Sequence, residues 1–159
     1  MASHKGHELF NVVMFAPSIF FVPVDYLPFF GAGYFLGTFF LSPDIDLSYS
    51  KPSQRLKFLK IIWFPFWIFS KHRGITHKPF LGTFIKLFYL TFVGIFLFFA
   101  ILGVLSLLGV KTDIYKINPF ELLEEIMRKR ETLYFIGGLL LADLFHITLD
   151  WITSRVKIK

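Results

Sequence analysis

The residues best suited to chemistry are histidines and acids, and they fall into four short groups. Imidazole nitrogen and carboxylate oxygen are ligands that proteins use for divalent metals. The chain has no cysteine, so a thiolate site is excluded, and all five of its histidines belong to these groups. The groups are His4, His7 and Glu8; Asp44 and Asp46; His72 and His77; and Asp143, His146 and Asp150. This composition predicts a metal site built from nitrogen and oxygen ligands.

The last group is informative by its spacing. Asp143, His146 and Asp150 are three and four residues apart, so they project from one stripe of a helix. An acid in an apolar helix costs free energy unless it is paired or lines a polar cavity, and a metal would supply the counter-charge. Simpler roles stay open: Asp143 as the partner of a buried Ser, Thr or Lys, Asp44 and Asp46 as capping residues, His72 and His77 as parts of a basic loop, and His4 as a solvated tail residue.

The elements that must position these groups are strongly apolar. Of the 159 residues, 55% are hydrophobic and 23 are Phe, and the mean hydropathy is +0.61. A soluble domain of this size needs far less apolar surface for one core. We therefore expect an all-α fold, a polytopic membrane helix bundle of about four spans with an interfacial aromatic segment. Residues 1–159 would form a single transmembrane helical domain.

The first two apolar runs form a short hairpin in this prediction. They cover Leu9–Val24 and Tyr26–Pro43, and both are shorter than the roughly 20 residues of a full span. The stretch 23–28, Pro-Val-Asp-Tyr-Leu-Pro, should end one helix and begin the next. Gly33 and Gly37 are four residues apart and would allow another helix to approach closely.

The third and fourth runs are the stronger span candidates. Leu87–Val110 is uncharged and would extend about 36 Å as a helix. Between the two runs, Asn118-Pro119 with acids after it predicts a helix start. The last helix should run from about Leu133 to Thr153.

A basic segment decides the expected orientation. Residues 44–78 contain seven of the 17 Lys and Arg residues, and within them Phe58–Phe69 suits a broken helix in the headgroup zone. With four spans, the N-terminus, this segment and the C-terminal tail share one side, which the positive-inside tendency makes cytoplasmic. All four groups of candidate ligands then reach that face. The net charge of +6 would attract anionic lipid headgroups rather than nucleic acid, because the basic residues lie in loops between apolar runs.

A family resemblance rests on these motifs in combination. They are His7 with an adjacent acid, Gly37 followed by Pro-Asp-Ile-Asp, Arg55 with Trp63-Phe-Pro, His-Arg-Gly-Ile-Thr-His with Gly82, and His146-x-x-x-Asp150-Trp. From about His7 to Trp151 the chain resembles an uncharacterised bacterial family of metal-binding membrane proteins, related to LexA-regulated inner-membrane metal-dependent hydrolases. Glu8 stands where that family usually has Asp. The resemblance implies metal ligation by His7, Asp44, Asp46, His72, His77, His146 and Asp150.

These observations predict a metal-dependent hydrolase in the cell inner membrane, with both termini cytoplasmic. It would bind one or two divalent ions (Zn, Mn, Fe or Mg) and cleave phosphoesters in lipids or small anionic substrates. Asp46 could accept a proton, and Arg73 could clamp an anionic oxygen. One alternative is a structural metal in an interaction module. Another is a metal transporter, for which only Lys86 and the end of the last span offer polar residues. The oligomeric state is left open.

Overall fold

The part of the chain described by this computed structural model, residues 4–70 and 74–156, is helical and contains no strand. The all-α prediction is thereby confirmed. The α-helices are α1 (His4–Ser18), α2 (Leu27–Phe39), α3 (Lys51–Arg55), α4 (Phe64–Phe69), α5 (Leu81–Leu107), α6 (Pro119–Arg128) and α7 (Arg130–Val156). Short 3-10 helices lie between them: η1 (Ile19–Phe21), η2 (Val24–Tyr26), η3 (Pro43–Asp46), η4 (Lys57–Trp63), η5 (Ile75–His77) and η6 (Asp113–Lys116).

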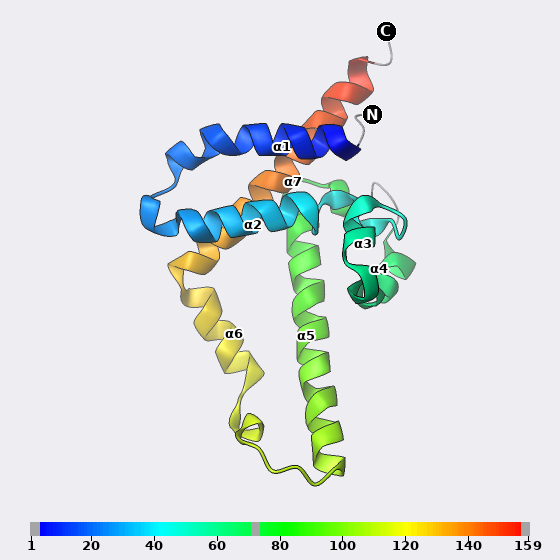
Figure 1. The fold of residues 1–159 in the computed structure, drawn as a ribbon, viewed down its shortest axis with the longest axis vertical. Helices are drawn as coiled ribbons and strands as arrows, with labels where there is room; N and C mark the ends of the chain where they lie inside the picture. Colours follow the sequence, from blue (N-terminus) through cyan, green and yellow to red (C-terminus); the bar gives the residue numbers. More distant parts are fainter. Residues whose placement is uncertain (1–3, 71–73, 157–159) are drawn as a thin grey trace.

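Helices α1 and α2 form the predicted hairpin, which lies across the direction of α5 rather than along it (Figure 1). The proline-rich stretch 23–28 separates them, because proline cannot donate to a helix ladder. Their 15 and 13 residues correspond to about 22 and 20 Å, less than the roughly 30 Å of a hydrocarbon core.

The main packing contact joins α2 to α7, and glycines bring the two backbones together. A Cβ atom on Gly33 would lie 2.0 Å from the Phe135 carbonyl oxygen, and one on Gly138 would lie 2.2 Å from the Phe30 carbonyl oxygen. Gly37 is also closely approached by α7, since a Cβ atom there would lie 3.1 Å from the Ala142 Cβ atom and 3.4 Å from the Leu139 Cα atom. The close approach predicted from Gly33 and Gly37 is therefore confirmed.

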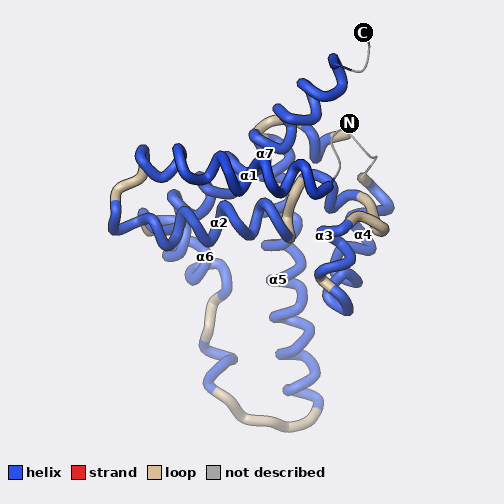
Figure 2. Tube along the Cα trace, turned by 45° about the horizontal axis from the view of Figure 1, so that its top comes forward, coloured by secondary structure: helices blue, strands red, loops and turns tan. Residues whose placement is uncertain are grey.

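Helix α5 projects away from the rest of the molecule, as both ribbon views make plain (Figures 1 and 2). Its buried residues, Gly82, Thr83 and Lys86, all lie in its first two turns. Among the described residues two helices are long and apolar enough to cross a membrane, Leu81–Leu107 and Arg130–Arg155. The bundle of four spans is therefore not confirmed. The physical reason is that α1 and α2 end early, with 3-10 turns occupying the residues between them.

The two long helices meet near the start of α5 and near the middle of α7. They touch where the Lys86 amine meets the Asp143 carboxylate. From that level α5 continues to Leu107 for about 32 Å, whereas α7 returns to Arg130 for about 20 Å. In Figure 1 the C-terminal half of α5 therefore extends beyond α7.

Two local predictions in the connecting segments hold. Helix α6 begins at Pro119, with the Asn118 side chain accepting a hydrogen bond from the Phe120 amide at 3.0 Å. The aromatic stretch Phe58–Phe69 is a broken helix, divided between η4 and α4. It leaves Phe58 80% and Phe69 85% exposed.

Candidate metal centre

Four elements far apart in the sequence meet at one end of the molecule. Helix α1 contributes His7, η3 contributes Asp44, η5 contributes His77, and the C-terminal half of α7 contributes His146 and Asp150. Within the described residues these side chains make two groups whose possible ligand atoms lie within 4.8 Å of one another. One group is His7, His146 and Asp150, and the other is Asp44, His77 and His146.

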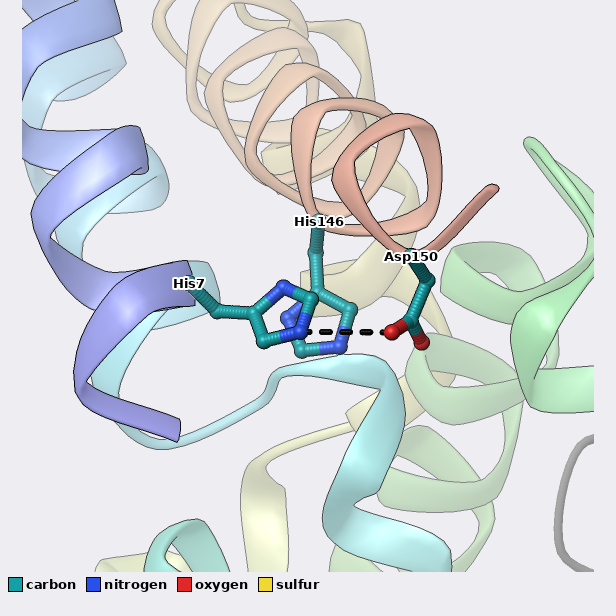
Figure 3. A group of neighbouring side chains, drawn as sticks. All are labelled: His7, His146 and Asp150. Atoms are coloured by element: carbon teal, nitrogen blue, oxygen red, sulfur yellow. Dashed lines mark ion pairs between the residues drawn. The ribbon is translucent and has the colours of Figure 1, made fainter. Parts of the chain in front are cut away.

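The first group is buried between α1 and α7. The rings of His7 and His146 are stacked with their centroids 4.0 Å apart and their planes 18° apart. His7 Nε2 lies 3.3 Å from Asp150 Oδ1. Figure 3 shows the carboxylate beside the stacked rings, with its oxygens directed toward them. Two imidazoles and a carboxylate are thus presented to one small volume.

The second group surrounds Asp44. Asp44 Oδ1 lies 3.4 Å from His77 Nε2, and Asp44 Oδ2 lies 3.6 Å from His146 Nε2. Burial disfavours ionisation of Asp44, but its contacts with His146 and His77 outweigh this effect, so the pKa of Asp44 lies well below its usual range. The group therefore offers an ionised oxygen between two nitrogens.

The two groups form one cluster rather than two separate sites. They share His146, and His77 Nε2 lies 3.9 Å from Asp150 Oδ2. His146 Nε2 and Asp150 Oδ1 are buried without a hydrogen-bond partner among the described residues. Buried polar atoms without partners cost free energy. A divalent cation would satisfy these atoms, and a mixed nitrogen and oxygen set suits Zn, Mn or Fe, so the residues fit a metal.

Asp46 lies behind this cluster instead of in either group. Its side chain is buried, and Asp46 Oδ2 accepts a hydrogen bond from the Thr76 hydroxyl at 2.8 Å. The same oxygen lies 3.9 Å from His77 Nδ1, the ring nitrogen that faces away from Asp44. The Thr76 hydroxyl, which is bonded to Asp46, also lies 3.2 Å from His77 Nδ1, so Thr76 and Asp46 together orient the His77 ring, as outer groups commonly do for metal-binding histidines.

Glu8 is engaged in an ion pair next to the cluster. Its Oε1 atom accepts a hydrogen bond from Arg55 and lies 2.8 Å from His4 Nε2. Burial raises the pKa of Glu8, but the Arg55 hydrogen bond and the neighbouring His4 lower it more, so it lies below its ordinary value. Arg55 also donates to the Phe39 carbonyl at 3.2 Å. Through these two contacts Arg55 connects α3 to the start of α1 and to the end of α2.

With this geometry in view, comparison with known proteins gives the chain's family. The family described as "Uncharacterized metal-binding protein (DUF2227)" matches residues 2–159. The chain belongs to this family. A relative from Aquifex aeolicus (strain VF5), described as "Uncharacterized protein", is 58% identical over 137 residues, which cover 86% of this chain and 97% of the relative. No solved structure matches the chain.

A metal site agrees with the description of this family as metal-binding. The structure brings together five of the seven predicted ligands: His7, Asp44, His77, His146 and Asp150. Asp46 lies just behind them, bonded to Thr76. His72 and Arg73 lie outside the described residues. Asp143, on the same stripe of α7, pairs with Lys86 and Thr83. That arrangement is the packing role left open for Asp143.

Two residues that support the cluster were missed in the sequence. Thr76 holds Asp46, and Asn11 joins α1 to its neighbours by donating to Thr38 Oγ1 at 3.2 Å and to the Ala142 carbonyl at 3.0 Å. The available signal for Asn11 was its position one helical turn after His7, as a polar residue in an apolar run. For Thr76 it was the position directly before His77.

Proposed function

We propose that this protein is a membrane-embedded, metal-dependent hydrolase that cleaves phosphoester bonds in lipids or in small anionic substrates. The observation that carries the proposal is the convergence of three histidines and two aspartates from four elements on one cluster. Two buried atoms, His146 Nε2 and Asp150 Oδ1, have no hydrogen-bond partner among the described residues, which supports a cation between them. The family that the sequence resembles is related, in that prediction, to LexA-regulated inner-membrane metal-dependent hydrolases, and this suggests the same reaction class.

The roles in this proposal follow from position. His7, Asp44, His77, His146 and Asp150 would hold one or two ions of Zn, Mn, Fe or Mg, which is more donors than one tetrahedral site needs. When bound, such an ion would lower the pKa of a water molecule and polarise the scissile phosphoryl group.

Two further side chains complete the proposed chemistry. Asp46 would act as an additional ligand or as the proton acceptor, because its carboxylate is fixed by Thr76 at the edge of the cluster. Arg73 would bind an anionic oxygen of the substrate, since a guanidinium matches phosphate geometry.

The proposed location is the cell inner membrane, with the cluster at the cytoplasmic face. Support comes from α5, whose mean hydropathy reaches 2.6 over a stretch that is 0% buried, and from α7, where it reaches 1.6. In four-span insertion, the hairpin of α1 and α2 would complete the bundle. Exposed Lys57, Lys60 and Phe58 on η4 support anionic lipid headgroups as partners.

The experiment compares two histidine substitutions in the detergent-solubilised full chain. We expect His146→Ala to weaken metal binding by more than about a hundredfold, beyond the usual loss from an outer-sphere change, and to abolish hydrolysis. His4→Ala is the matched control, because His4 lies outside both ligand groups, and it should retain both properties. Metal content by elemental analysis and turnover of a phosphoester and phospholipid panel with Zn, Mn, Fe or Mg give the readouts.

A structural metal in a non-catalytic interaction module is the second candidate. It is favoured by the way the cluster ties four separate elements together. In that case the wild type binds metal without hydrolysing any substrate in the panel, and His146→Ala lowers the melting temperature of the metal-loaded protein. A wild type that binds none of the four metals would contradict both candidates.

A further inference from the structure

A buried ion pair lies next to the metal cluster but outside it. Lys86, the one charged residue in the sequence of α5, is 2% exposed, and its partner Asp143 on α7 is 3% exposed. Lys86 Nζ lies 2.7 Å from Asp143 Oδ2. Removing two charges from water costs free energy, so a buried ion pair at this position calls for an explanation by function.

The pair joins three parts of the chain at a single point. Lys86 Nζ also donates a hydrogen bond to the Leu41 carbonyl, just after the end of α2. The Thr83 hydroxyl donates to the same Asp143 oxygen at 2.5 Å. Asp143 Oδ1 has no hydrogen-bond partner among the described residues. The carboxylate is therefore used as a link between elements rather than being fully satisfied.

Two of the joined parts carry proposed metal ligands within three residues of the link. On α7, Asp143 precedes His146 by three residues. After α2, Leu41 precedes Asp44 by three residues. A change in the position of either linked residue is passed directly to an imidazole or a carboxylate of the cluster.

The third part, the start of α5, fixes the loop that carries His77. Gly82 packs so closely that a Cβ atom there would lie 2.2 Å from the Thr76 carbonyl oxygen. Thr76 in turn holds Asp46 and precedes His77. The first turns of α5 are thus pressed against the His77 segment, and the Lys86 link decides where those turns lie.

We propose that Lys86 and Asp143 are positioning residues of the metal centre: they set the distances between the ligands on η3, η5 and α7. Stability alone does not explain the pair, because replacing a buried ion pair by apolar residues of similar volume is often neutral or stabilising. Metal ligands, in contrast, must be held within about 0.5 Å of their working geometry. The proposal rests on the metal-binding part of the proposed function.

The test replaces both charges at once, as Lys86→Met with Asp143→Leu in the full chain. We expect the metal-free protein to melt at or above the wild-type temperature, while Zn²⁺ affinity falls about ten- to hundredfold, the usual effect of changing groups that orient ligands. The visible spectrum of bound Co²⁺, which reports ligand geometry, should also change. Lys116→Met with Asp113→Leu is the matched control, since that ion pair is 82% and 89% exposed, and it should alter neither property.

Wild-type Zn²⁺ affinity and Co²⁺ spectrum in the double variant would overturn the proposal. If the double variant does not fold, Lys86→Met alone is tested, because it removes the link to the Leu41 carbonyl and to Asp143 while the Thr83 hydroxyl can still donate to the Asp143 carboxylate. A folded Lys86→Met protein with a changed Co²⁺ spectrum supports positioning, and an unchanged one overturns it. A wild type that binds metal but hydrolyses nothing would overturn the hydrolase proposal alone, whereas one that binds no metal would overturn both.

Discussion

Helices α5 and α7 are equally long but contribute to this protein in different ways. Each has 27 residues, and each is apolar enough to cross a membrane. In the most apolar stretch of α7, 28% of the residues are buried against the rest of the chain, whereas in that of α5 none are. Helix α7 packs on α2 and supplies His146 and Asp150 to the cluster. The buried residues of α5 lie in its first two turns, and its contacts with the aromatic segment extend one turn further, to Tyr89 and Leu90.

The difference shows that hydropathy alone does not define what surrounds a helix. An apolar helix can be covered by protein or by lipid, since both remove its side chains from water. Three ionisable residues of α7, Asp143, His146 and Asp150, are buried where other elements cover the helix. The exposed part of α5 has no charged residue after Lys86. The following predictions test whether α5 is the lipid-facing helix and α7 the protein-facing one.

The largest effect is expected from a charge in the middle of α5. Leu97→Arg should make membrane insertion of α5 less favourable by about 3 kcal/mol, because arginine is costly at the centre of a span. An added Lys116→Cys, labelled with an impermeant maleimide from each side of the membrane, reports whether α5 crosses. Leu122→Arg on α6 is the matched control, as the two leucines are 43% and 48% exposed. Equal labelling in both variants would refute the assignment of α5 as a span.

A second, smaller effect compares one glycine from each helix. Gly138→Ala on α7 should destabilise the protein by about 1 to 3 kcal/mol, since the new Cβ atom would lie 2.2 Å from the Phe30 carbonyl oxygen and overpack the helix contact. Gly94→Ala on α5 has nothing within 4 Å and should stabilise the helix by up to about 1 kcal/mol. Thermal melting of both variants in the same detergent measures the difference. If the two variants melt together, α7 is not packed more tightly than α5.

The smallest effect concerns two ion pairs, one beside the cluster and one on α6. Arg55→Ala beside the cluster should cost about 0.5 to 1 kcal/mol, or about 1 to 4 °C in melting temperature, as its pair with Glu8 is partly shielded from water. Because the folded pKa of Glu8 lies below its ordinary 4.5, this contribution is present above pH 4.5 and is lost as the pH falls through the folded pKa. Melting curves at pH 7 and in acid check this.

Arg128→Ala on α6 is the control for that comparison. The Arg128 and Glu124 side chains are 78% and 62% exposed, so their pair should contribute almost nothing at any pH. A loss as large as that of Arg55→Ala would show that the region beside α5 is as tightly structured as the cluster.

Local patterns predicted much of the fold. Prolines at 23 and 28 placed the break between α1 and α2, and Asn118-Pro119 placed the start of α6. Gly33 and Gly37 marked the close helix contact. These signals work because each depends on residues within one or two turns. The number of spans was not predictable in this way, since it depends on how far a helix continues and on its direction relative to α5.

The candidate site likewise has features that local sequence patterns predicted and features that they could not predict. Helical spacing correctly placed Asp143, His146 and Asp150 on one stripe. Spacing could not decide which of them joins a cluster, because Asp143 meets Lys86 from a different helix. Glu8 meets Arg55, 47 positions away in the chain. Such partners are chosen by packing between distant segments and leave no local signal.

The sequence by itself determined the chemistry that is available: nitrogen and oxygen ligands without sulfur, in four groups carried by apolar helices. Only the tertiary structure decided which side chains meet, bringing His7, Asp44, His77, His146 and Asp150 together while leaving Glu8 and Asp143 to ion pairs. The physical reason is that ligand types are properties of single residues, whereas distances between them depend on where helices cross. Here that crossing is set by the glycine contacts of α2 and α7 and by the link from Lys86 to Asp143.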